Sequence, residues 1–182
     1  MKNIVLKYGL ISGALLAILT AIMLPLCLNG TIPFENSELI GYSTMVLSFI
    51  AVFFGIRAYR ENVGNGRITF GRAFKVGILI TLITCAVYVI GWEIVYWNFL
   101  PDFGETYARL STERMRNAGA SAADIAQHQQ RMAQFMEWYK NPFFNVGMTF
   151  LEVFPVGLLV TLISAAILRK KPEDRAGAPV TA

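Results

Sequence analysis

Two carboxylates, Glu93 and Glu152, stand inside long apolar runs of the chain. An ionised carboxylate within hydrocarbon is costly, so such residues usually face other helices or water. At the helical rise of ~1.5 Å per residue, Glu93 lies about 6 Å from the end of its run and Glu152 about 14 Å into its own. We expect a proton or cation site reached from one side of a membrane.

Polar groups near these glutamates support that hypothesis. Pro155 has no N–H to donate, which leaves the carbonyl of Leu151 free as an acceptor close to Glu152. In the alternative interpretation, Glu93 reaches back to the membrane interface, and Glu152 is a protonated acid that joins helices through a hydrogen bond. Three residues are candidate hydrogen-bond partners for the site: Tyr88, Tyr96 and Thr149.

The residue types needed for enzymatic chemistry are sparse. His128 is the single histidine, which limits both metal binding and general-base catalysis. Cys27 and Cys85 are too few for a disulfide framework. The glycines of residues 64–71 match neither the dinucleotide fingerprint nor the phosphate-binding loop. We therefore expect no enzyme activity, no cofactor and no metal.

Composition indicates a membrane protein. Hydrophobic residues make up 55% of the chain and charged residues 15%, against about 25% charged residues in soluble domains. The net charge of +4 comes from basic residues that stand beside the apolar runs. Such residues typically mark the cytoplasmic side of a membrane. The predicted partner is therefore membrane lipid and not nucleic acid.

Four apolar runs are each close to the roughly 20 residues that a helix needs to cross a bilayer. The first run is too long for the core of a signal peptide and no cleavage site follows it, so we expect it to be retained. The predicted fold is all-α, an integral membrane four-helix bundle in which residues 1–171 form a single membrane domain. The predicted spans are residues 8–28, 39–58, 76–97 and 143–168.

Small residues recur every three or four positions in the first two spans. Such stripes allow the backbones of two helices to approach closely. The neighbouring helix is either in the same chain or in a second copy, so a homo-oligomer stays open. The candidate helix-packing residues are Gly9, Gly13, Gly41, Ser48 and Gly55.

Residues 98–141 form the sizeable segment outside the predicted spans. It holds five basic and five acidic residues, and the sequence Ala118–Ser121 interrupts its helical pattern. Ser121 and Asp124 resemble a capping box, which marks a helix start. We predict an extramembrane helical hairpin between the third and fourth spans.

The positions of lysine and arginine predict the orientation. The N-terminus, the Arg57–Lys75 loop and the C-terminal tail hold 11 of these residues, and the loop at residues 29–38 holds none. The positive-inside rule then places both termini in the cytoplasm and the hairpin outside, as in a bacterial cytoplasmic membrane. Residues 172–182 are predicted to be a disordered cytoplasmic tail. The topology anchors are Arg57, Arg60, Arg67, Arg72, Lys75, Arg169, Lys170 and Lys171.

Several runs also resemble a known family, the bacterial domain of unknown function 4199. They are ITFGRAFKVG at 68–77, WEIVYWNFLPDF at 92–103 and TFLEVFPVGLLVTLISAAILRKK at 149–171. The start MKNIVLKYGLISG and residues 121–142 extend the resemblance to about residues 1–171. It implies a small four-span membrane protein. It brings no activity, substrate or catalytic residue.

Two functional hypotheses follow. In the first, the protein is a non-enzymatic structural or interaction protein that binds a protein partner through the outer hairpin. In the second, it is a small oligomeric transporter or channel subunit that moves protons, cations or a small solute by means of Glu152 and Glu93. A shared wet cavity at the two glutamates would favour transport, and a dry, hydrogen-bonded bundle would favour the structural role.

Overall fold

The computed structural model describes residues 1–170, which fold into α-helices joined by short turns and one 3-10 turn, η1 (Phe34–Asn36). Four of the helices are long and apolar enough to cross a membrane. The all-α prediction is therefore confirmed. The long helices are α1 (Lys2–Leu28), α2 (Ser37–Asn62), α3 (Phe70–Phe99) and α6 (Pro142–Leu168), and the short ones are α4 (Phe103–Asn117) and α5 (Ala122–Tyr139).

The helices α3, α5 and α6 begin where a side chain supplies a missing acceptor. Thr69 accepts the backbone N–H of Arg72 at the start of α3, and Ser121 accepts that of Asp124 at the start of α5. Asn141 does the same for Phe143 at the start of α6. The helices α2 and α3 extend several residues beyond the predicted spans 39–58 and 76–97. The predicted spans cover only the apolar residues, and polar residues outside the hydrocarbon continue each helix.

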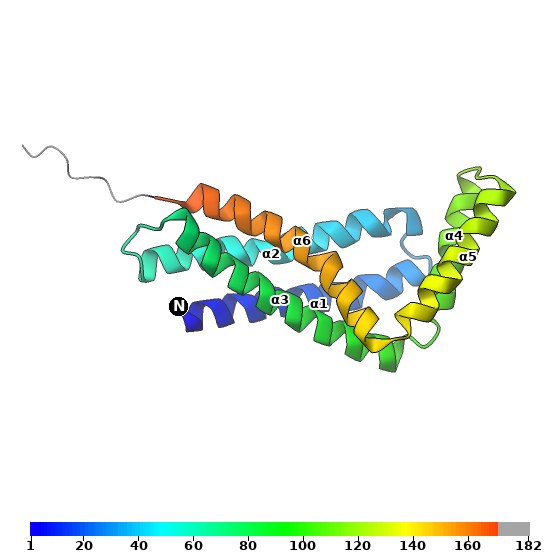
Figure 1. The fold of residues 1–182 in the computed structure, drawn as a ribbon, viewed down its shortest axis with the longest axis horizontal. Coiled ribbons are helices and arrows are strands. Elements are labelled where there is room, and N and C mark those ends of the chain that lie inside the picture. The colour runs from blue at the N-terminus through cyan, green and yellow to red at the C-terminus, as the bar shows by residue number, and fades with distance from the viewer. Residues whose placement is uncertain (171–182) are drawn as a thin grey trace, which may run out of the picture.

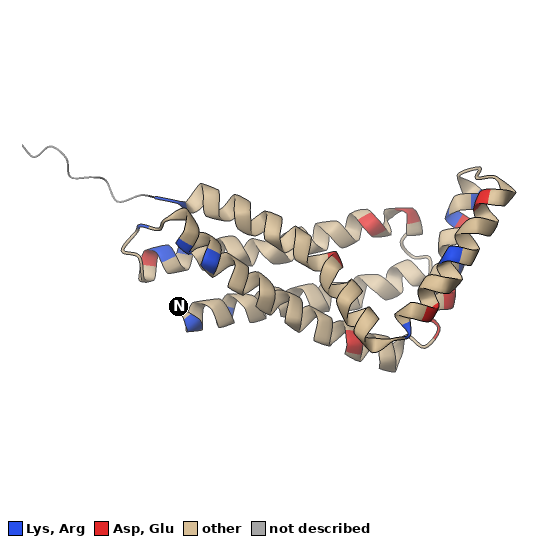
Figure 2. Ribbon diagram, viewed as in Figure 1, with Lys and Arg blue, Asp and Glu red and all other residues tan. Residues whose placement is uncertain are grey.

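The four long helices lie lengthwise beside one another, and α4 with α5 stands across one end of them (Figure 1). Here, the end that carries α4 and α5 is called the hairpin end. The opposite end, with the N-terminus and the loop at residues 63–69, is called the basic end. Lys and Arg gather at the basic end, both signs of charge are mixed on α4 and α5, and the middle lengths of the long helices are almost free of charge (Figure 2). The predicted helical hairpin is thus present, as α4 packed against α5.

The core is densest between the middle of the bundle and the basic end. Phe49, Ile56, Ile80 and Val153 are completely buried there. Phe49 of α2 lies against Gly157 of α6, where an added Cβ would come within 2.6 Å of the phenyl ring. Such close contact fixes how α2 and α6 cross.

The predicted packing residues divide into two groups. An added Cβ would lie 2.7 Å or less from a neighbouring helix at Gly9, Gly13 and Gly55, so these glycines lie in helix contacts. Ser48 is buried and its carbonyl accepts the hydroxyl of Ser12 at 2.8 Å. Gly41 has no atom within 4 Å of an added Cβ, because the helices diverge at its level and leave open space.

The helix α6 separates from α2 toward the hairpin end (Figure 1). Pro155 lies inside α6, and a proline within a helix removes a backbone hydrogen bond and bends it. The half of α6 that begins at Pro142 then follows α3, while α2 continues beside α1. This divergence creates the space described below.

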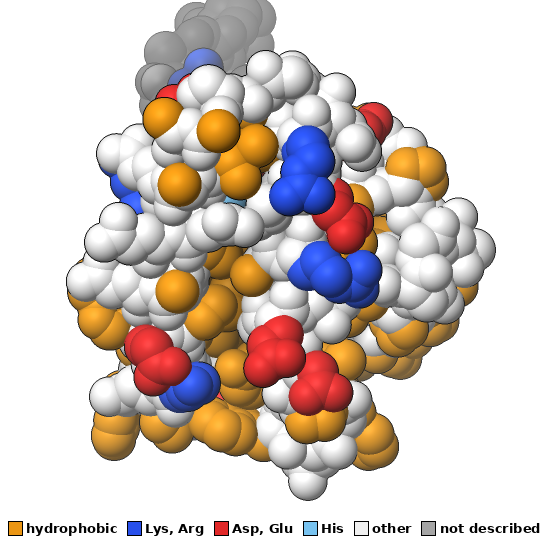
Figure 3. All heavy atoms as spheres, turned by 90° about the vertical axis from the view of Figure 1, so that its right-hand side faces the viewer, with side chains coloured by type: hydrophobic (Ala, Val, Ile, Leu, Met, Phe, Trp, Pro, Cys, Tyr) orange, Lys and Arg blue, Asp and Glu red, His pale blue; other side chains and the backbone are white. Residues whose placement is uncertain are grey.

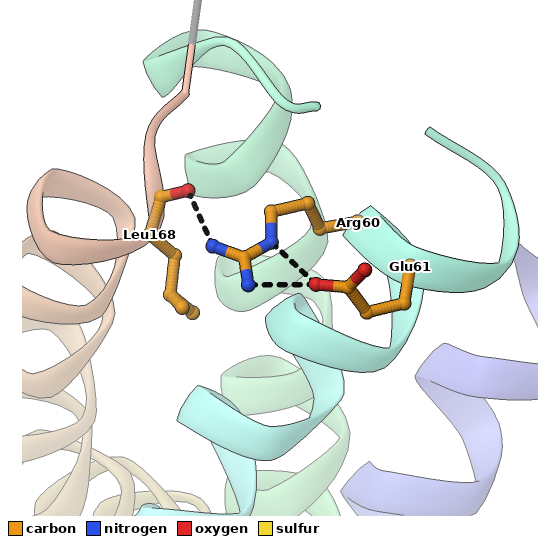
Figure 4. Close-up of polar contacts among 3 residues, drawn as sticks. All are labelled: Arg60, Glu61 and Leu168. Carbon is orange, nitrogen blue, oxygen red and sulfur yellow. Dashed lines mark hydrogen bonds and ion pairs between the residues drawn. The ribbon is translucent and has the colours of Figure 1, made fainter. Parts of the chain in front are cut away.

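At the basic end, the predicted Arg57–Lys75 loop comprises the end of α2, a shorter loop at residues 63–69 and the start of α3, and it holds the end of α6. Arg60 donates to the carbonyl of Leu168 at 3.4 Å and pairs with Glu61 at 2.7 Å (Figure 4). The backbones of Ile68 and Lys170 exchange two hydrogen bonds. This segment therefore stabilises the C-terminal end of α6 and also carries a cluster of positive charge. The predicted anchor Lys171 and the predicted tail at 172–182 lie outside the described residues.

Candidate functional site

A chamber of about 610 Å³ lies where the long helices diverge at the hairpin end. All four long helices contribute to its wall, and side chains of α4 and α5 cover it. Most of its lining is aliphatic or aromatic. The acidic residues Glu38 and Glu152 line it, and no lysine, arginine or histidine does.

Aromatic side chains form the wall between α3 and the hairpin. The ring of Phe103 lies 5.5 Å from that of Trp92 and 5.7 Å from that of Tyr107, measured between centroids. Tyr107 in turn meets Phe34 of η1 at 5.4 Å. These edge and tilted contacts favour a defined orientation of the rings. They attach α4 to α3 on one side of the chamber and to η1 on the other.

Glu152 places its carboxylate in the chamber. It precedes Pro155 by less than one turn of α6, and the residue is exposed. No group of residues 1–170 forms a hydrogen bond with it. The Leu151 carbonyl, which Pro155 cannot engage, belongs to another lining residue. The carboxylate is thus available to whatever occupies the chamber.

The other predicted partners of Glu152 lie near it but serve different contacts. Tyr88 lines the chamber. Thr149 is buried behind the wall, where its hydroxyl donates to Asn145 at 3.2 Å. Tyr96 packs its ring against Tyr139 at 5.5 Å and does not line the chamber.

Glu93 lies outside the chamber. Its carboxylate accepts the indole N–H of Trp97 at 2.8 Å, one turn along the same helix. The other carboxylate oxygen, Oε1, is buried and has no partner among the described residues. The two glutamates therefore do not converge on the chamber, because Glu152 lines it and Glu93 does not.

Asn145 was missed by the sequence reasoning, although an asparagine within an apolar span is itself a signal of interhelical hydrogen bonding. It is completely buried, and its Oδ1 accepts the indole N–H of Trp92 at 3.0 Å. The hydroxyls of Thr149 and Tyr139 lie 3.4 Å apart. This network fixes Trp92 and Tyr139 from behind, so that two walls of the chamber have a defined shape.

An ion pair closes the rim of the chamber. Arg114 of α4 donates to Glu38 of α2 at 2.8 Å. Within the hairpin, Ser111 and His128 share a hydrogen bond of 2.8 Å that links α4 to α5. Figure 3 looks onto this end, where charged side chains stand at the surface and apolar ones show between them. The hairpin is thus a charged cover with an apolar underside.

Burial affects the two hairpin tyrosines that line the chamber. Desolvation raises the pKa of Tyr139 to about 12, and it also raises the pKa of Tyr107. Both side chains are therefore neutral hydroxyls at physiological pH. They contribute hydrogen-bonding capacity and aromatic faces to the chamber, and no charge.

Four long apolar helices with most of their charge near their ends define a multi-pass helical membrane protein. The chain belongs to the family described as protein of unknown function (DUF4199), whose model matches residues 7–170. This confirms the family resemblance noted in the sequence. No curated protein and no solved structure matches the chain.

Proposed function

We propose that this membrane protein binds a small, largely apolar solute in the chamber, as the binding unit of a transporter. The observation that carries the proposal is the chamber of about 610 Å³ with the accessible carboxylate of Glu152 in its wall. Small-molecule sites in proteins typically measure about 300–1,000 Å³ and combine an apolar lining with a few polar groups. In this proposal the protein has no enzymatic activity.

The packing of the bundle supports access from the hairpin end. Toward the basic end, Phe49 fills the space beside Gly157, and the hydroxyls of Thr81 and Thr161 lie 2.9 Å apart. These buried contacts close the bundle below the chamber. Passage of a solute to the basic end requires a second conformation in which α2 and α6 separate there.

We further propose that the basic end lies in the cytoplasm of a bacterium and that the hairpin end faces outward. The support is the gathering of lysine and arginine at the basic end, which positive-inside topology explains. Both termini are then cytoplasmic, and the chamber receives its solute from outside or from the outer leaflet.

A protein partner at the hairpin, and assembly into a homo-oligomer, remain predictions. The apolar side chains Phe103, Phe135 and Met136 of the hairpin face the chamber. A partner would therefore meet a mainly polar surface, and this favours solute binding over scaffolding as the principal role.

The test fills the chamber without disturbing the bundle. Gly41 lines the chamber and has no atom within 4 Å of an added Cβ. Gly147 of α6 has equally free space but does not line the chamber. Gly41→Trp should therefore occupy the chamber, and Gly147→Trp is its matched control.

The full chain in lipid nanodiscs is photolabelled with an uncharged alkyl diazirine and mapped by mass spectrometry. In the wild type and in Gly147→Trp, we expect label at Glu152 and Met136 well above that at the exposed membrane residue Leu159. Gly41→Trp should reduce the chamber label at least fivefold. Equal labelling of chamber and membrane residues, unchanged by Gly41→Trp, would show that the chamber takes up no solute.

A further inference from the structure

We infer that the solute is an organic cation, an apolar body with a protonated amine or quaternary centre. The inference rests on the proposed function and specifies the chemical class that the chamber accepts. Three features of the lining carry it: the sign of its charges, the unpaired state of one carboxylate, and the aromatic faces around that carboxylate.

The charges that line the chamber have a single sign. Glu38 and Glu152 are the carboxylic acids that line it, and no lysine, arginine or histidine does. Arg114, the cation at the rim, is already paired with Glu38 at 2.8 Å. Glu152 has no such partner among residues 1–170. A cationic ligand would therefore find one free counter-charge, whereas an anionic ligand would meet only repulsion.

The position of Glu152 distinguishes a cation from a neutral solute. A neutral apolar body can occupy the aliphatic part of the chamber, but it supplies no counter-charge to the carboxylate as water leaves, so it should bind more weakly than a cation of the same shape. A cation would supply the missing partner as the water leaves. Leu151 also lines the chamber, and because Pro155 has no N–H to donate to its carbonyl, that carbonyl is a candidate second acceptor for an ammonium N–H.

The aromatic wall favours the same class of ligand. Cations are attracted to the faces of tryptophan and tyrosine rings, and this attraction grows when the site is shielded from water. Tyr88 and Trp92 line the chamber from α3, and Tyr107 and Tyr139 line it from the hairpin. The buried network around Asn145 orients Trp92 and Tyr139 before any ligand arrives, which lowers the ordering cost of binding.

The test uses two probes of nearly the same shape and opposite charge, tetraphenylphosphonium and tetraphenylborate. Their charges do not change with pH. Binding to the full chain in detergent is measured by isothermal titration calorimetry. We expect tetraphenylphosphonium to bind at least tenfold more tightly than tetraphenylborate, and Glu152→Gln to weaken its binding at least tenfold. Glu93→Gln, which alters a carboxylate outside the chamber, should leave binding unchanged.

A second variant separates charge from folding. Glu152→Asp keeps the carboxylate and should retain binding within about threefold of the wild type, with the helical circular dichroism of all variants unchanged. Equal binding of the two probes, or equal weakening by Glu152→Gln and Glu152→Asp, would overturn the cation assignment. If the uncharged diazirine still labels the chamber in that case, solute binding stands and only the class of ligand is wrong. If it does not, solute binding itself is wrong.

Discussion

Arg114 and Glu38 are 76 residues apart in sequence, and their side chains meet at 2.8 Å across the rim of the chamber. Arg114 belongs to the hairpin and Glu38 to the first turn of α2. Within residues 1–170, this is the salt bridge that joins the hairpin to the long helices; the other three pair residues within four positions of each other. The cover of the chamber is therefore held by one exposed ion pair and by aromatic contacts.

Loss of this pair should loosen the cover without unfolding the bundle. Exposed ion pairs contribute about 0–1 kcal/mol, so Arg114→Ala should change the stability of the whole protein by less than about 1 kcal/mol. We expect faster amide hydrogen exchange in α4 and unchanged exchange in α3. The exchanged pair Arg114→Glu with Glu38→Arg should restore protection. If Arg114→Ala leaves exchange in α4 unaltered, the ion pair does not hold the cover.

Alanine at Gly157 should destabilise the bundle, whereas alanine at Gly41 should not. At Gly157 the new Cβ would lie 2.6 Å from Phe49, and overpacking of this kind costs about 1–3 kcal/mol. At Gly41 the space is free, and alanine gains up to about 1 kcal/mol in helix propensity. Unfolding in sodium dodecyl sulphate, followed by circular dichroism, measures both. Equal midpoints for the two variants would contradict the contact between α2 and α6.

Trp92→Phe should cost more than Trp97→Phe. The first variant removes the buried bond to Asn145, and interhelical hydrogen bonds in membrane proteins contribute about 0.6 kcal/mol on average and up to about 1.7 kcal/mol. Trp97 is 50% exposed and bonds to Glu93 within its own helix, so its loss should be close to neutral. The same unfolding assay compares them. A larger loss from Trp97→Phe would contradict the role given to Asn145.

The attachment of the hairpin should weaken at alkaline pH. Tyrosine titrates near pH 10 in an unfolded chain, and burial raises the pKa of Tyr139 to about 12. Since the folded form prefers the neutral hydroxyl, its stabilising contribution is complete below pH 10 and is lost as pH rises from 10 to 12. The difference in stability between the wild type and Tyr139→Phe should decrease over this window. The titration of other groups is common to both proteins and cancels in this difference, which therefore reports on Tyr139. A constant difference would show that Tyr139 ionises as it does in water.

Labelling of single cysteines should establish the orientation. In a background with Cys27→Ala and Cys85→Ala, cysteine is placed at the exposed Asn117 of the hairpin or at the exposed Asn62 of the basic end. On intact cells, a membrane-impermeant maleimide should modify Asn117→Cys at once. Asn62→Cys should react only after permeabilisation. The reverse pattern would place the chamber on the cytoplasmic side.

The sequence was sufficient for everything that depends on local chemistry. Apolar runs predict the long helices because each span must satisfy its own backbone in lipid. Thr69 and Ser121 predict helix starts because their hydroxyls accept the first free amide groups. The charge distribution predicts which ends stand outside the hydrocarbon. None of these depends on how the helices rotate or tilt.

The chamber depends on rotation, tilt and bend, and only the tertiary structure decided these. Gly9 and Gly41 are both glycines on small-residue stripes, yet one lies in a helix contact and the other faces open space. Glu93 and Glu152 have the same side chain, yet Glu93 accepts a hydrogen bond from Trp97 and Glu152 lines the chamber. The physical reason is that the bend at Pro155 and the crossing of Phe49 over Gly157 separate α2 from α6 at one end only. A helical pattern in the sequence predicts which residues share a face, and the packed bundle determines which faces are in contact.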